Sequence, residues 1–485
     1  MGKLNQLKPT QVWENFEVLC NIPRPSKKEQ KVIQFMKEFG GKLGLKTVVD
    51  GVGNVIIKKP ATPGMENRRG IILQGHLDMV PQKNSDKVHD FEKDPIVPRI
   101  DGEWVKATGT TLGADNGLGV ASIMTVLQSK DLAHGPVEAL FTIDEETGMT
   151  GAFGLKPGML DGDVLLNLDS EDEGELYVGC AGGIDASIKF HYKEEDVPAN
   201  HTAYKLSITG LKGGHSGLEI ILGRGNSNKL MNRFLKYASK QFQIRISSIE
   251  GGSLRNAIPR ESFVTLLVPA QNETSFVKAV ATYQAIYKKE FSDVDADIKF
   301  VAEKTIAPAN VFDLKTQTEM IHTVYACPNG VIRMSDSMPG MVETSTNLAI
   351  IKSEKGVILI ACLLRSSVDS AKDDLVEAVH STFALSSAEI KFEGGYPGWK
   401  PNMNSAILKT AGEVYKKKFG KVPEIKAIHA GLECGLLGGV YKNLDMLSFG
   451  PTIRYPHSPD EKAYIPSVQK FWDFLVEVLK NAPLK

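Results

Sequence analysis

Ile71-Ile72-Leu73-Gln74-Gly75-His76-Leu77-Asp78 joins an apolar run to a His-x-Asp pair. The apolar run has the length and composition of a short buried strand. A histidine and an aspartate two positions apart can share one task at the end of such a strand. The imidazole faces a metal ion, and the carboxylate orients the ring or the nucleophile beside it. His-x-Asp also occurs by chance in many chains, so the meaning of the pair depends on the rest of the sequence.

The size and charge of the chain set broad limits. Its 485 residues exceed what one hydrophobic core usually supports, so we expect two domains. The formal net charge is -1, and no basic stripe or acidic tail suggests a nucleic-acid partner. No apolar run approaches the ~20 residues that a transmembrane helix needs, so we expect no membrane partner either.

The cysteines and the N-terminal residues predict the cellular compartment of the protein. The five cysteines are scattered and form no Cys-x-x-Cys pair. This pattern argues against a disulfide framework or a thiolate zinc site and suits a reducing compartment. The first residues are polar and lack the apolar core of a secretory signal. We therefore expect a cytoplasmic protein.

Strand and helix patterns alternate along the N-terminal part of the chain. Strands are expected at residues 55–58, 70–73, 137–143 and 164–168. Helices are expected at residues 10–19 and 116–127, and Ser26 to Glu29 has the spacing of a capping box that opens another helix. The alternation predicts an α/β fold, a doubly wound and mostly parallel sheet with helices on both faces. Ligands of such sheets collect beyond the carboxyl ends of the strands.

The pattern changes near residue 185 and returns after the Gly/Pro-rich stretch at 394–398. The part between has strand patterns with exposed faces, for example at 186–192 and 204–209, and helix patterns at 226–239 and 275–290. The alternation of strands and helices then returns, with strands expected at 425–428 and 446–449 and a helix at 468–479. We predict a discontinuous catalytic domain of residues 1–184 and 396–485, interrupted at 185–395 by an inserted α+β lid/dimerisation-type domain.

Acidic residues gather where three further elements begin or end. Asp115 lies in a Gly-rich loop before a helix, Asp144-Glu145-Glu146 follows the strand at 137–143, and Asp169 follows the strand at 164–168. Asp115 would also suit a helix N-cap, and the three consecutive acids a solvated loop. Crowded acids repel one another unless a cation neutralises them, so we interpret these residues as part of a metal site. His457, in a Pro-bounded loop beyond the strand at 446–449, adds a second imidazole.

The predicted ligand set consists of two imidazoles and three carboxylates: His76, Asp115, Glu146, Asp169 and His457. This set suits Zn²⁺ and also Mn²⁺ or Co²⁺. It is too large for one tetrahedral ion with an open position. It fits two ions ~3.5–4 Å apart, joined by one carboxylate and one water molecule. Such a centre hydrolyses an amide, although these ligands alone leave a phosphoester open. The remaining glutamate of the acidic run would then take a proton from the water.

Seven segments, in order, resemble the motifs of the zinc aminopeptidase, aminoacylase and carnosinase superfamily, and the resemblance covers the whole chain. The segments are residues 74–80, 111–117, 144–148, 167–171, 213–217, 429–435 and 456–459. The resemblance implies a dinuclear metal-dependent dipeptidase that acts on small peptides, Xaa-His dipeptides among them. It also implies a homodimer.

The resemblance distributes the roles of the metal-site residues. His76 and Asp169 would hold one ion, Glu146 and His457 the other, and Asp115 would bridge the two. Asp78 would support His76 from behind. Glu145 would act as the general base and then as the general acid.

Four further residues are candidates for substrate binding. By resemblance, His215 would donate to the substrate carbonyl oxygen, in its own subunit or in a neighbour's. Arg365 follows an apolar strand and carries a planar guanidinium that suits the substrate α-carboxylate. Asn256 is a candidate for the same pocket, and Glu433 for seating the substrate.

Two other functions are compatible with the same ligands. A tripeptidase or an N-acyl amino acid deacylase would need the same metal centre. A non-catalytic protein that keeps the metal ions for structure is the alternative from another class. Glu145 argues against it, because a structural site needs no base.

Overall fold

The computed structural model describes residues 4–485, which divide into two compact units. Unit 1 contains the residues up to Gly179 together with Pro401–Ala427 and Leu432–Lys485. Unit 2 contains Cys180–Lys400 and the short segment Ile428–Gly431. The chain thus changes units at residues 180 and 400 rather than at 185 and 395, and it returns once more to unit 2 at 428–431.

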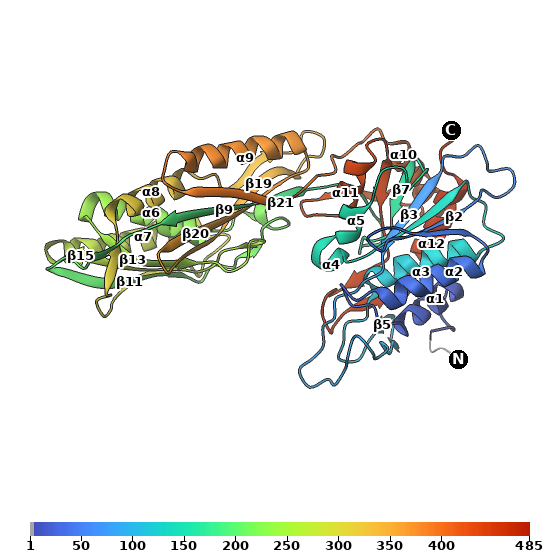
Figure 1. Ribbon diagram of the computed structural model, residues 1–485, viewed down its shortest axis with the longest axis horizontal. Coiled ribbons are helices and arrows are strands. Elements are labelled where there is room, and N and C mark those ends of the chain that lie inside the picture. Colours follow the sequence, from blue (N-terminus) through green and yellow to red (C-terminus); the bar gives the residue numbers. More distant parts are fainter. Residues whose placement is uncertain (1–3) are drawn as a thin grey trace. The chain divides into compact units, whose positions relative to one another are not determined.

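Unit 1 is built on an eight-stranded sheet with the order β1-β2-β6-β3-β7-β23-β8-β22 (Figure 1). The four middle strands run parallel to one another: β6 (Val137–Thr142), β3 (Ile71–His76), β7 (Val164–Asn167) and β23 (Asp445–Ser448). The outer strands are β1 (Lys46–Val49), β2 (Val55–Lys59), β8 (Glu175–Cys180) and β22 (Glu424–Ile428). The pairs β1–β2, β2–β6 and β8–β23 are antiparallel. The predicted α/β class is confirmed, and the antiparallel flanks add to it.

Helices of unit 1 pack on this sheet and on each other. Helix α3 (Ala114–Gln128) packs on β3, and α1 (Thr10–Cys20) packs on α3. Because α3 lies between a strand and a helix, nearly all of its residues are buried and its sequence is apolar all round. The other helices are α2 (Gln30–Lys42) on β1 and β2, α10 (Ala406–Phe419) on β23 and α12, α12 (Ile465–Lys480), α4 (Glu145–Gly148), α5 (Thr150–Gly154) and α11 (Glu433–Val440).

The predicted capping box at Ser26 and Glu29 is wrong. Helix α2 begins at Gln30, and no side chain caps it. The Ser26 hydroxyl donates instead to Asp78 Oδ2 at 2.8 Å, and Glu29 Oε1 accepts the backbone N–H of Asp144 at 3.1 Å. These two side chains therefore hold loops at the end of the sheet, where their hydrogen-bonding capacity satisfies buried groups.

The parallel strands bring chain segments that are distant in sequence to one edge of the sheet. All six residues of β3 are buried, and the strand ends at His76. Strand β6 leads into the acidic run that starts at Asp144, and β7 leads into Asp169. After β23 the chain enters a small four-stranded sheet of β4 (Arg99–Asp101), β5 (Trp104–Lys106), β25 (Lys462–Tyr464) and β24 (Ile453–Arg454). His457 lies in the turn between β24 and β25.

Unit 2 is a nine-stranded sheet covered by a layer of four helices (Figure 1). The sheet has the order β16-β11-β15-β13-β19-β20-β9-β21, β18 also pairs with β19, and the pairings are antiparallel. The strands are β9 (Gly182–His191), β11 (His201–Thr209), β13 (Arg245–Gly251), β15 (Ser262–Pro269), β16 (Lys299–Lys304), β18 (Gly330–Met334), β19 (Val342–Glu354), β20 (Val357–Ser366) and β21 (Glu389–Tyr396).

The helices of unit 2 contact one another in the order α7, α6, α8, α9. Their bounds are α6 (Ser227–Phe242), α7 (Glu273–Glu290), α8 (Leu314–Ala326) and α9 (Asp369–Ala384). One apolar core joins them to the sheet, with Phe190, Phe234 and Phe276 among its fully buried residues. Short pairs complete the unit: β10 (Glu194–Asp196) with β17 (Asn310–Phe312), and β12 (Gly214–His215) with β14 (Ala257–Ile258).

Candidate metal centre and substrate-binding residues

The Asp115 carboxylate lies between two imidazoles. Its Oδ1 is 3.1 Å from His76 Nε2, and its Oδ2 is 3.1 Å from His457 Nε2. The backbone is non-helical at Asp115, with φ -80° and ψ 114°, although the residue sits at the start of α3. The residue therefore caps no helix, and each of its oxygens is turned to a different histidine.

Two groups of potential ligands share Asp115. His76 and Asp169 form one group with it, and Glu146 and His457 form the other. Asp169 Oδ1 is 3.3 Å from His76 Nε2, and Glu146 Oε2 is 2.8 Å from His457 Nε2. In each group the ligand atoms lie within 4.8 Å of one another. The structure thus brings all five side chains of the predicted ligand set together.

The charges in this cluster perturb one another strongly. Hydrogen bonds to Asp115 and Glu146 raise the pKa of His457 to about 11. Burial, together with the charge of Asp115, raises the pKa of Asp169 to about 7 against the opposing charge of His76. The carboxylates hold positive charge at the imidazoles, and divalent cations compete for the same place.

Asp78 organises the centre from behind. Its Oδ1 is 3.4 Å from His76 Nδ1 and also accepts the backbone N–H of Glu145 at 3.0 Å. Its other oxygen accepts the backbone N–H of Glu146 at 3.3 Å. One buried carboxylate therefore orients an imidazole and fixes the turn that carries the two glutamates, as the outer partner of a ligating histidine does.

Glu145 lies beside the cluster without joining either pair around Asp115. One oxygen of Glu145 lies within 4.8 Å of ligand atoms of His76 and Glu146. Burial and the nearby carboxylates of Asp169 and Glu433 raise its pKa well above the usual range, although His76 opposes the shift. A glutamate with a raised pKa beside a reaction centre is suited to exchange protons.

Asp144, the first acid of the run, has a structural role. It adopts a left-handed backbone with φ 52°, and the hydroxyls of Thr147 and Thr150 donate to its carboxylate. The acidic run therefore divides, with one residue that holds the turn and two that face the cluster.

Glu461 and Arg24 position the centre, and no sequence motif identified either residue. The Glu461 carboxylate accepts backbone N–H groups from all four residues at 112–115, at 2.7, 3.0, 2.7 and 3.3 Å. Arg24 donates to the carbonyls of Leu77, Asp78 and Gly113 at 2.9, 2.9 and 2.6 Å. Both side chains are almost fully buried. They fix the two loops that carry His76 and Asp115.

Glu433 belongs to unit 1 and lies in its interior, 1% exposed. Its Oε2 accepts hydrogen bonds from Gln74 Nε2 at 2.6 Å and Thr142 Oγ1 at 2.8 Å. Its Oε1 is buried without a hydrogen-bond partner among the described residues. Glu433 therefore links the ends of β3 and β6 and keeps one acceptor free.

The other predicted substrate-binding residues belong to unit 2. The His215 Nδ1 atom accepts backbone N–H groups from Gly217 at 3.1 Å and Leu218 at 3.0 Å. A nitrogen that accepts carries no proton, so the proton of the neutral ring is on Nε2, which is a donor. Burial and the charge of Arg365 lower the pKa of His215 and favour this neutral form.

Arg365 is a buried cation with little compensation, 5% exposed. Within residues 4–485 it forms no ion pair, its Nε atom has no hydrogen-bond partner, and Nη1 donates to the Tyr396 hydroxyl at 3.2 Å. Burying a guanidinium without a charged partner costs free energy, so we expect an anion to bind to this side chain.

Asn256 and His429 also belong to unit 2. The Asn256 side chain is exposed, and its backbone carbonyl accepts the N–H of Ser216 at 2.8 Å. His429 is a residue for which we predicted no role. It is buried, lies 2.7 Å from the Ser345 hydroxyl, and has a pKa lowered to about 3 by burial and by the charge of Arg365.

Comparisons with known proteins place this arrangement in a family. The model of Peptidase family M20/M25/M40 matches residues 72–481. The chain is 47% identical to the cytosol non-specific dipeptidase of Escherichia coli K12 over 485 residues, all of both proteins. The crystal structure of aminoacylhistidine dipeptidase from Vibrio alginolyticus superposes with a TM-score of 0.96 at 49% identity, over 100% of this chain and 99% of that one.

A more distant structure shares the fold. Aminopeptidase PepT from Bacillus cereus has a TM-score of 0.57 at 16% identity, over 98% of this chain and 99% of that one. No helix within residues 4–485 has the length and apolar character that crossing a membrane requires.

Proposed function

This chain belongs to peptidase family M20/M25/M40, and on that premise we propose that it cleaves dipeptides with two divalent metal ions, zinc first among them. It is a metal-dependent dipeptidase, because the two relatives that it matches along its full length are dipeptidases. The alternatives of a tripeptidase, a deacylase and a binding protein are not favoured. The observation that carries the metal proposal is the Asp115 carboxylate, with one oxygen 3.1 Å from each imidazole.

The donor atoms fit such a pair of ions. Glu146 Oε1 and Asp169 Oδ1 are buried and make no hydrogen bond within the described chain. Imidazoles and carboxylates without thiolates suit zinc, manganese or cobalt. We assign His76 and Asp169 to one ion, Glu146 and His457 to the other, and Asp115 to both. When bound, the ions would acidify a water molecule and polarise the peptide carbonyl.

Glu145 supplies the proton transfers of the proposed mechanism. Its carboxylate would take a proton from the attacking water as the oxygen adds to the carbonyl carbon. The same carboxyl would give that proton to the amide nitrogen as the C–N bond breaks, which leaves a free amine and a new carboxylate. A raised pKa matches this double task, because the group must accept and release a proton near neutral pH.

We further propose that Arg365 and His215 bind the substrate. The guanidinium of Arg365 would pair with the C-terminal carboxylate, which would favour short peptides with a free C-terminus. The Nε2–H of His215 would donate to the carbonyl oxygen, where negative charge develops. Asn256 would act through its backbone, which steadies the turn after His215. Glu433 would act on the substrate indirectly, through its hydrogen bond to Gln74, because its own carboxylate is buried.

Substitution of Glu145 tests this mechanism. Glu145→Gln should keep both metal ions by elemental analysis and lower kcat by roughly 10²–10⁴, the usual contribution of an acid–base group. Glu173→Gln is the matched control, because this nearby acid is outside both ligand groups. Normal turnover of Glu145→Gln would remove the assigned base, and loss of metal would make Glu145 a ligand. A panel of Xaa-His and other dipeptides, tripeptides and N-acetyl amino acids would define the substrate range.

Location and assembly are also proposals. We propose a cytoplasmic protein, supported by the word cytosol in the name of the Escherichia coli relative. We propose a homodimer, supported by the family resemblance. Sedimentation velocity of the purified chain would distinguish a dimer from a monomer.

A further inference from the structure

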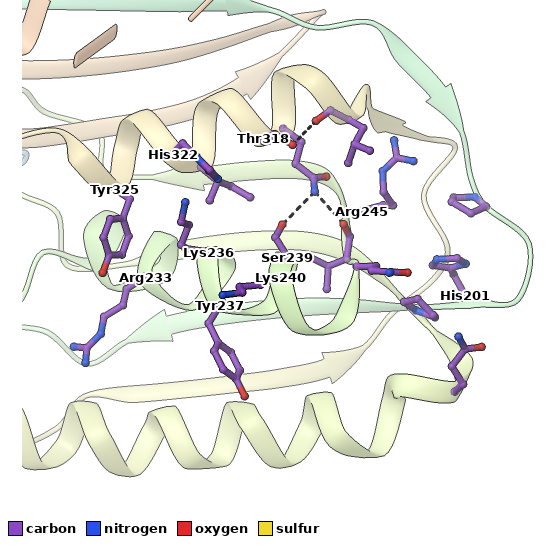
Figure 2. Close-up of a pocket in the computed structure, with 18 of the residues that line it drawn as sticks. His201, Arg233, Lys236, Tyr237, Ser239, Lys240, Arg245, Thr318, His322 and Tyr325 are labelled. Atoms are coloured by element: carbon purple, nitrogen blue, oxygen red, sulfur yellow. Dashed lines mark hydrogen bonds between the residues drawn. The ribbon is translucent and has the colours of Figure 1, made fainter. Parts of the chain in front are cut away.

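Unit 2 contains a groove between helices α6 and α8 that none of the functions above uses (Figure 2). Its volume is about 1170 Å³, and it is lined by residues of both helices and by the adjacent ends of strands. The floor is preformed, because Gln317 Nε2 donates to the Ile244 carbonyl at 2.9 Å and its Oε1 accepts the Ile246 N–H at 2.7 Å. The groove is therefore a built feature of this unit.

The lining of the groove is cationic and contains no carboxylate. It includes two lysines, two arginines, two histidines and three tyrosines, and neither aspartate nor glutamate. Over the whole chain acidic and basic residues are balanced, 58 against 57. The groove thus concentrates positive charge in a protein of almost no net charge, and such concentration favours anions.

The arginines are already neutralised, whereas the lysines are not. Arg233 pairs with Glu290 and Arg245 with Glu195, each at 2.6 Å. Lys236 and Lys240 form no ion pair with any described residue. They are one helical turn apart on α6, where like charges repel. Burial and the charge of Lys240 also lower the pKa of Lys236. An anion bound at this pair would remove the repulsion.

An aromatic face lies beside this charge. Figure 2 shows Lys236 extending from α6 towards His322 and Tyr325 of α8. The Lys236 ammonium is 6.0 Å from the centre of the Tyr325 ring, and Tyr325 is 54% exposed. A ligand with both an anionic and a planar group could pair with this cation and stack on the accessible ring.

We propose that this groove binds the di- or triphosphate group of a small molecule. Lys236 and Lys240 contact the phosphates as point charges, the way in which lysine usually binds phosphate. The groove, at about 1170 Å³, is somewhat larger than most small-molecule sites, which occupy roughly 300–1,000 Å³, so a di- or triphosphate group fits within it. Nucleotides and inorganic polyphosphate share this anion, and Tyr325 distinguishes them because only a nucleotide has a base that can stack on the ring. The inference goes beyond dipeptide hydrolysis and does not depend on it.

Isothermal titration of the full-length protein with ATP and with tripolyphosphate tests the proposal. We expect both probes to bind, and the double variant Lys236→Met/Lys240→Met to weaken both at least tenfold. Lys288→Met/Lys289→Met is the matched control, because it removes the same charge from exposed lysines of α7 outside the groove. If Tyr325→Ala weakens ATP alone, nucleotides are the source of the anion. If it leaves both affinities unchanged, inorganic polyphosphate is.

Three results would overturn the proposal. The first is absence of binding of both probes at millimolar concentration. The second is an equal loss in the two double variants, which would mean a general charge effect. The third is a native protein that binds neither probe while Lys236→Met/Lys240→Met changes its sedimentation, which would mean that another copy of the chain covers the groove. Chelation of metal ions by the probes is common to all variants and cancels in the comparison.

Discussion

Glu461→Gln tests whether one buried carboxylate holds the loop that presents Asp115. Glu461 Oε2 accepts the N–H groups of Leu112 and Gly113, and Oε1 accepts those of Ala114 and Asp115. An amide has the same shape but turns one of these oxygens into a donor. Two buried N–H groups then face an NH₂ group and lose their acceptor.

The expected magnitude follows from these contacts. A buried donor without a partner costs about 1–3 kcal/mol, so two such donors should lower the free energy of unfolding by roughly 2–6 kcal/mol. Urea unfolding of the metal-free protein measures this loss without the contribution of bound ions. Asp460→Asn is the matched control, because that neighbouring side chain is exposed. If Glu461→Gln and Asp460→Asn unfold at the same urea concentration, the Glu461 carboxylate does not stabilise this loop.

Two further predictions concern unit 2. Arg365→Met should raise KM for dipeptides about 10- to 100-fold, because it removes a charge-assisted hydrogen bond. The KM for C-terminally amidated dipeptides should not change. An equal rise of KM for both substrates would contradict recognition of the carboxylate. The pKa of His429 is about 3 in the folded chain and about 6.5 in the unfolded chain. The free energy of unfolding should therefore decrease as the pH falls below about 6.5, because the unfolded chain then binds more protons. Between pH 7 and pH 5.5, the free energy of unfolding measured with urea should fall by about 1 kcal/mol because of this group, and this part of the fall should be absent in His429→Asn. The same change of unfolding free energy with pH in the two proteins would disprove the prediction.

The parts of the site that follow strands were predictable from sequence. A buried parallel strand needs continuous apolar residues, so the run before His76 identified β3 and its end. Acidic residues after β6 and β7 were then expected at the same edge, because parallel strands end together. His457 was harder to place, since it lies in a turn of a small sheet that no sequence pattern predicted.

The groups that hold the ligands were not predictable in the same way. Glu461 acts on a loop about 350 residues earlier in the chain, and only the folded chain reveals such a contact. The same holds for Arg24, which reads as an ordinary residue before a proline. Ser26 and Glu29 show the converse, because a local pattern with a sound physical basis was overridden by tertiary hydrogen bonds.

The metal content of the purified protein shows whether Asp115 joins a pair of ions. Elemental analysis after dialysis should give two divalent ions per chain for the native sequence and for Asp172→Asn, an acid that pairs with Arg454 outside the ligand set. Asp115→Ala should lose both ions, because each imidazole would lose the carboxylate oxygen it shares. A single ion in the native protein, or two ions retained by Asp115→Ala, would mean that Asp115 does not join a pair of ions.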